Sequence, residues 1–147
     1  MPKYQDHKYF DHSGIFISYL IDESEEEKFS IITTGLEKSL SHIGLYNKKD
    51  IVINSDAGYG VGLEMKNGKI HVNGNAGDLV GWEMKNGKIH VNGNVGSLVG
   101  LGMQSGEIHV DGNAGYGVGL EMKNGKIHVK GNAGDLVGLG MQSGEIH

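Results

Sequence analysis

Five histidines recur with a 19-residue period, and imidazole is a side chain that binds zinc and nickel well. They are His71, His90, His109, His128 and His147. If the copies stack on one another, the histidines form a column in which neighbours could share a metal ion. No Asp or Glu recurs consistently beside them, whereas a metal site needs a defined ligand set. We therefore favour duplication of an outward-facing strand residue, and we keep the first four histidines as the alternative candidates for metal ligands.

Two glycine-rich segments have the composition of a phosphate-binding loop. They span residues 58–62 and 115–119, and both read Gly-Tyr-Gly-Val-Gly. A dinucleotide-binding loop follows a strand and opens a helix. Here the residues that come next continue the repeat, so we interpret both segments as corners of the repeat.

Three glutamates are candidates for general acid–base chemistry, namely Glu64, Glu83 and Glu121. Their repeat position is held by glycine in two other copies, at Gly102 and Gly140, so the carboxylate is not a constant part of the repeat. Trp82 replaces a leucine of the other copies, which indicates packing or a surface contact. Since no nucleophile is paired with a base in a recognisable pattern, we predict no catalytic residue and no cofactor.

The composition excludes several classes of protein. The net charge of -5 gives no basic footprint for nucleic acid, and the absence of cysteine removes disulfides and thiolate metal sites. Residues 1–11 contain no apolar core of a signal peptide, and no apolar stretch reaches the roughly 18 residues that span a bilayer. We expect a soluble, cytoplasmic protein with neither nucleic acid nor membrane as a partner.

The 19-residue period predicts the architecture. Glycine supplies 26 of the 147 residues, and a helical repeat would be destabilised by such a content. Residues 69–73 alternate polar and apolar side chains, and the turn-forming pair Asn67-Gly68 precedes them. Parallel stacking keeps every residue beside its own copy at roughly 4.8 Å. We predict a mainly β protein, a single-stranded parallel β-helix of 19-residue coils over residues 48–147.

The stack would place identical side chains in columns. Isoleucine, valine and methionine columns face inward, and asparagines at positions 75, 94, 113 and 132 form a ladder of stacked amides at a corner. An outward column alternates in sign from Lys88 through Glu107 and Lys126 to Glu145. Opposite charges on neighbouring strands stabilise the stack, so this column is interpreted as surface rather than as a binding site.

Residues 1–47 are predicted to form a small α/β cap. Residues 14–21 are rich in β-branched and aromatic side chains and predict a strand. Ser24 and Glu27 match a capping box and predict a helix over residues 24–43, with Gly44 as its stop. We expect this amphipathic helix to cover the first coil. The last coil has no predicted cap, so protein partners or self-association are expected there, unless the chain is truncated at His147.

Residues 58–77 follow the pattern Gly-x-x-x-Gly-x-x-Met-x-x-Gly-x-Ile-x-Val-x-Gly-Asn-Ala-Gly. This pattern resembles the glycine-rich (GXGXG) repeat domain of the glutamate synthase large subunit and of the C subunit of formylmethanofuran dehydrogenase. The phrase Gly-Asn-Ala-Gly-Asp-Leu-Val-Gly at 74–81 and 131–138 is most similar to the dehydrogenase repeat. The resemblance covers residues 48–147, about two thirds of the chain.

The resemblance implies a right-handed parallel β-helix that serves as a scaffold beside catalytic domains and carries no flavin, iron–sulfur, molybdopterin or glutaminase residues of its own. The expected function is thus a non-catalytic scaffold module, a subunit or relative of an oxidoreductase complex. One alternative is a stand-alone metal- or ligand-binding protein that uses the outward histidines. Another is a diverged enzyme that acts between residues 1–47 and the coils.

Overall fold

The computed structural model describes residues 12–147 and contains one helix and one sheet. Residues 1–11, which the sequence assigns to the cap, lie outside the described part. The helix is α1, His12–Glu23, and no helix within residues 12–147 is long and apolar enough to cross a membrane. The strands are β1 Lys28–Ile31, β2 Asp50–Ile53, β3 Lys69–Val72, β4 Lys88–Val91, β5 Glu107–Val110, β6 Lys126–Val129 and β7 Glu145–Ile146.

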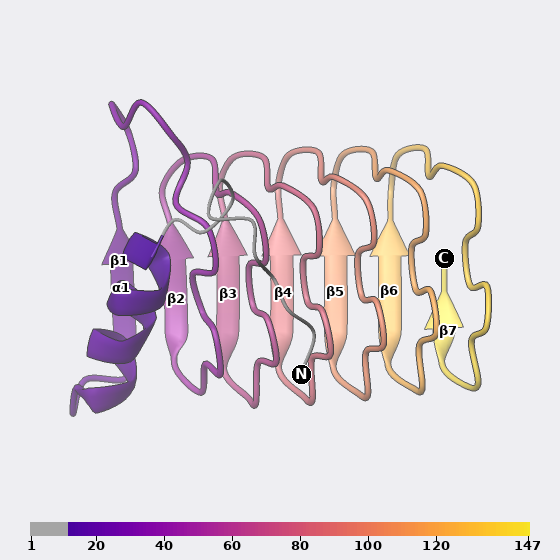
Figure 1. Cartoon of the computed structure of the whole chain (residues 1–147), viewed down its shortest axis with the longest axis horizontal. Helices are drawn as coiled ribbons and strands as arrows, with labels where there is room; N and C mark the ends of the chain where they lie inside the picture. The colour runs from indigo at the N-terminus through magenta and orange to yellow at the C-terminus, as the bar shows by residue number, and fades with distance from the viewer. Residues whose placement is uncertain (1–11) are drawn as a thin grey trace.

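The seven strands form one parallel sheet in chain order, and each coil of the chain adds one strand (Figure 1). From β2 onward the register follows the period of the sequence: Ile51 pairs with Ile70, and Ile70 pairs with Ile89. The predicted single-stranded parallel β-helix of 19-residue coils is therefore confirmed.

The interior consists of the predicted apolar columns. Ile70, Ile89, Ile108 and Ile127 are at most 1 % exposed. The valines two residues after the first three of these, in β3, β4 and β5, are fully buried. Met65, like its copies in the next three coils, is also 0 % exposed, as expected for a flexible thioether that fills the space between faces. Because strand residues alternate between faces, these columns direct the intervening histidines outward.

From Ile70 onward, a glycine lies opposite each isoleucine of the inward column because no Cβ fits there. A Cβ on Gly81 would collide with Cδ1 of Ile108, and one on Gly100 would collide with Cδ1 of Ile127. Both glycines also have positive φ, 68° and 67°. The glycine and isoleucine columns are thus two sides of one packing arrangement, which explains why both keep the 19-residue period.

The asparagine ladder is built differently from the predicted stack of amides. Oδ1 of Asn75, Asn94 and Asn113 each accepts a hydrogen bond of 2.8 Å from the backbone N–H of the asparagine one coil later. At the start of the ladder Asp56 takes this role and accepts from the N–H of Asn75 at 2.7 Å. The side-chain oxygens therefore pair with the backbone at a corner where no strand ladder continues.

We expect Asn94→Ala to lower the free energy of unfolding by about 1 kcal/mol, since the N–H of Asn113 loses its acceptor. Asn94→Asp is the matched control, because Asp56 shows that a carboxylate serves at this position. Urea unfolding measures both variants. Equal losses in the two variants would show that the acceptor is not the source of the effect.

The cap has its helix and strand in the reverse order of the prediction. Residues 14–21, predicted as a strand, lie in α1, and the predicted helix over residues 24–43 is replaced by β1 and a long connection. The run 14–21 is apolar almost throughout, so its period does not separate helix from strand. The buried residues Gly14, Ser18 and Ile21 are spaced as one helical face.

Close packing on the first coil explains why this face contains small residues. A Cβ on Gly14 would overlap the backbone oxygen of Ser41. The hydroxyl of Ser18 lies within hydrogen-bond distance of the backbone oxygens of Gly14, at 2.7 Å, and His42, at 3.0 Å, and it accepts from the N–H of Gly44 at 2.9 Å. The expectation that a helix covers the first coil is thus correct, although α1 rather than residues 24–43 provides it.

The β-helix begins one coil before the predicted boundary near Lys48. β1 pairs with β2 in parallel, with Lys28 beside Asp50, so the first coil is longer than the regular coils (Figure 1). His42, Gly44 and Tyr46 have positive φ in the same alternating order as residues 79, 81 and 83 of a regular coil. The changed length and the scarcity of glycine hide this coil from a search for the 19-residue period.

Candidate functional site

The predicted histidine column exists on the outward face of the sheet. The ring centroids of His71 and His90 are 4.8 Å apart, and the following pairs along the column are separated by 6.3, 5.9 and 6.4 Å. The rings are inclined by 40–69° rather than stacked face to face. The strand register brings together all four predicted metal-ligand candidates, with His147 as the fifth member of the column.

Carboxylates lie beside three of these histidines, although no acidic column is visible in the sequence. Nε2 of His90 is 2.9 Å from Oδ2 of Asp111, which directly follows β5 and lies two positions beyond the residue paired with His90. Nε2 of His109 lies 3.7 Å from Glu107, and Nε2 of His147 lies 3.4 Å from Glu145. None of these contacts joins equivalent positions of two coils, so a comparison of positions one period apart does not reveal them. Within residues 12–147, however, no group of three or more histidine and acidic side chains is arranged to hold a metal ion.

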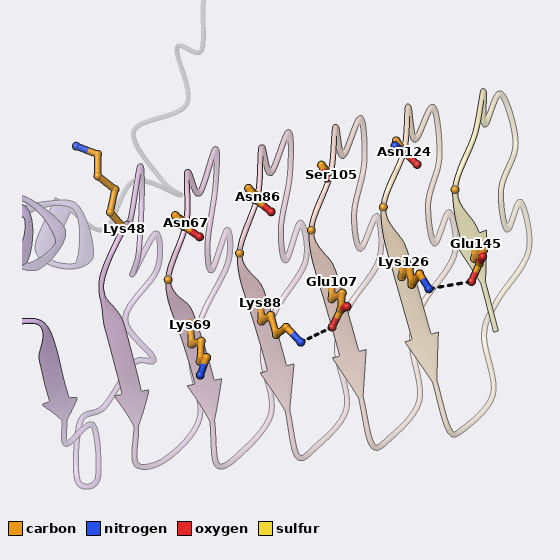
Figure 2. A pocket seen from close by; sticks show the side chains of 15 residues that line it. Lys48, Asn67, Lys69, Asn86, Lys88, Ser105, Glu107, Asn124, Lys126 and Glu145 are labelled. Carbon is orange, nitrogen blue, oxygen red and sulfur yellow. Dashed lines mark ion pairs between the residues drawn. The ribbon is translucent and has the colours of Figure 1, made fainter.

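A long shallow groove of about 560 Å³ runs along the coils beside the starts of the strands (Figure 2). Three adjacent columns line it: a polar column, a glycine column and the charged column. The polar residues are Asn67, Asn86, Ser105 and Asn124; the glycines are Gly68, Gly87, Gly106, Gly125 and Gly144; the charged residues are Lys69, Lys88, Glu107, Lys126 and Glu145. The sequence analysis did not predict this groove. Its signal in the sequence is that a polar, a glycine and a charged column follow one another at adjacent repeat positions.

The charged side of the groove is occupied by ion pairs along the column. Lys88 contacts Glu107 at 2.8 Å, and Lys126 contacts Glu145 at 3.5 Å (Figure 2). Nearby on the same face, Lys130 contacts Asp111 at 2.7 Å. The predicted pairing of opposite charges is therefore confirmed. These carboxylates neutralise lysines of the same chain, which favours their ionised form over the protonated form of a general acid.

The glycine floor of the groove is explained by coil stacking. A Cβ on Gly87 would lie 2.8 Å from the backbone oxygen of Gly68, and one on Gly106 would lie 2.7 Å from that of Gly87. The floor is smooth because each coil must pass close to the previous one. A ligand is not needed to explain these glycines.

We expect the stability of the fold to fall as the pH decreases below about 5. The hydrogen bond from Lys88 lowers the pKa of Glu107 below its ordinary 4.5, and Lys130, with His90, lowers the pKa of Asp111 below 3.8. The unfolded chain therefore takes up these protons first as the pH falls. The stabilisation from these two carboxylates is complete above their ordinary pKa values of 4.5 and 3.8, and it is lost as the pH falls through their lowered pKa values in the folded chain.

Urea midpoints between pH 7 and pH 3 test this dependence. A Glu107→Gln, Asp111→Asn double variant is expected to show a smaller decline over this range than the unaltered chain. The difference will be small because both ion pairs face solvent. An equally steep decline in the variant would assign the pH dependence to other carboxylates.

The other candidate residues lie in the corners and on the surface. Residues 58–62 and 115–119 lie in the corner turns of coils, and no helix follows either, so the dinucleotide loop is not formed. Glu64 forms an ion pair with Lys85 at 3.2 Å, while Glu83 and Glu121 are exposed at positive φ. Trp82 is half-buried.

No protein-family model matches this chain, and no curated protein matches it. The function is therefore inferred from the fold and from the geometry of the histidine column and the groove.

Proposed function

We propose that this chain is a non-catalytic β-helical scaffold that holds protein partners, comparable to the glycine-rich repeat domains of oxidoreductase complexes that it resembles. This proposal rests on one observation: the side chains that recur in each coil pack against or pair with other coils of the same β-helix. The isoleucine and methionine columns fill the interior, and the lysines and glutamates of the charged column pair with one another between successive coils. The groove and the histidine face lie on the coils, from Lys48 onward, so neither supports an enzyme site between the N-terminal segment and the coils.

An apolar face of α1 offers a surface for such a partner. Phe16, Tyr19 and Leu20 are 62, 60 and 51 % exposed and are spaced as one face of the helix. Clusters of exposed large apolar side chains are typical of protein-interaction sites. Self-association of the chain belongs to the same proposal.

Native mass spectrometry of the untagged protein from its own cells tests the scaffold. Co-purification with larger oxidoreductase or amidotransferase subunits supports the proposal, and a lone chain contradicts it. Phe16→Glu is expected to release the partner. Tyr116→Glu is the matched control, since Tyr116 is an aromatic residue of similar exposure, 52 %, on the coils away from α1.

A further inference from the structure

We propose that His71 and His90 form a binding site for one divalent transition-metal ion on the outward face of β3 and β4. This inference is independent of the scaffold function, because it rests on the geometry of two side chains and their neighbours. Imidazole nitrogen is a preferred ligand of Zn²⁺, Ni²⁺ and Cu²⁺. The ion would join two successive coils of the β-helix.

The spacing selects this pair from the whole column. Two imidazoles on one tetrahedral or square-planar ion, with metal–nitrogen distances of about 2.0–2.1 Å, have ring centroids roughly 4.5–5.3 Å apart. The centroids of His71 and His90 are separated by 4.8 Å. The other neighbouring pairs, at 5.9–6.4 Å, are too far apart for adjacent positions on one ion.

Asp111 orients the ring of His90 for this role. Nε2 of His90 lies 2.9 Å from Oδ2 of Asp111, and a carboxylate can only accept at that contact. When Nε2–H donates to Asp111, the neutral ring keeps its lone pair on Nδ1, which is then able to bind a metal. A carboxylate that accepts from the second nitrogen of a metal-binding histidine is a recurrent feature of metal sites.

There is room for an ion and its water ligands over this pair. A hollow of about 260 Å³ is lined by His71, His90 and His109, with Lys69, Lys88 and Glu107 beside them. The ammonium of Lys88 is paired with Glu107 at 2.8 Å, which offsets its repulsion of a cation. Because two imidazoles are the protein ligands, water completes the coordination, and the positive charge of Lys69 keeps the affinity moderate.

Isothermal titration of the untagged full chain with Zn²⁺ at pH 7.5 tests the site. We expect one ion per chain, and at least a tenfold loss of affinity in both His71→Ala and His90→Ala. His128→Ala is the matched control and is expected to bind zinc normally, since His128 belongs to the same column but its ring centroid lies at least 5.9 Å from those of its neighbours. Asp111→Asn should weaken binding by about tenfold.

Two results would overturn the proposal. One is the absence of zinc binding, and the other is an equal loss in His128→Ala, which would indicate diffuse binding along the column. Both histidines face outward, so the variants should fold, and a thermal melt checks this. If an alanine variant does not fold, His71→Gln or His90→Gln replaces it and must show the same loss. Neither result affects the partner test, which depends on α1.

Discussion

Gly106→Ala is expected to destabilise the β-helix strongly, with a loss of at least about 2 kcal/mol in the free energy of unfolding. Gly106 has φ 96°, which an alanine adopts only with strain. Its new Cβ would lie 2.7 Å from the backbone oxygen of Gly87 and 2.8 Å from Cε of Met84. Because the first of these atoms belongs to the backbone of the preceding coil, the two coils must separate. Thermal unfolding should show a melting temperature lower by about 5 °C or more.

Gly102→Ala is the matched control from the same coil. Gly102 also has positive φ, 61°, but the nearest atom to its added Cβ is Cγ of Glu83 at 3.5 Å, an ordinary contact. Glu83 and Glu121 occupy the same repeat position at φ 51° and 54°, so the position tolerates a side chain. We expect a change within about 1 kcal/mol. A loss equal to that of Gly106→Ala would show that positive φ, rather than coil stacking, dominates the cost.

The correctly predicted parts of the fold are those in which two periods occur together: the two-residue alternation of a strand and the 19-residue repeat of the coils. Ile70 and Val72 alternate with His71 along the chain, and all three recur with the 19-residue period in the strands β4, β5 and β6. The first period determines which side chains face inward, and the second determines which copies are neighbours. Together they define the core, the parallel register and the direction of the histidines, without any reference to a known structure.

The cap could not be predicted in the same way because it occurs once. Two residues of its buried helical face, Gly14 and Ser18, pack closely against the backbone at Ser41 and His42. Such a requirement is tertiary and leaves no apolar period in the sequence. Ser24 accepts from the N–H of Glu26 at 3.1 Å, so it forms a local turn before β1 rather than the predicted capping box.

For the candidate metal site, the sequence predicted the histidine column but not the contacts that distinguish one histidine from another. The sequence places the histidines on one face, but the contact between His90 and Asp111 crosses strands diagonally. The differences among ring separations, from 4.8 to 6.4 Å, arise from side-chain rotation and from such neighbours. A repeat of identical residues therefore does not produce identical sites, and the departures from the repeat, such as Asp111 among asparagines, are the informative positions.

Ile108→Ala is expected to cost about 2–5 kcal/mol, because it removes three carbons from a fully buried side chain in a middle coil. Ile108 packs between its copies Ile89 and Ile127 and over Gly81. The other isoleucines of the column hold the neighbouring coils in place, so these coils cannot move inward to fill the cavity that the substitution leaves. Urea unfolding at neutral pH measures the loss. His109→Ala, on the outward side of the same strand, is the control and should change stability by no more than about 0.5 kcal/mol.

A double-mutant cycle tests the cause of that loss. Gly81→Ala alone places a Cβ against Cδ1 of Ile108, and this collision disappears when Ile108 is alanine. The double variant should therefore be more stable than the sum of the two single losses predicts, by about 1 kcal/mol or more. Strict additivity would mean that the glycine column is required only for its positive φ of 68° at Gly81. Coupling would instead show that glycine and isoleucine form one packing unit that each added coil must repeat.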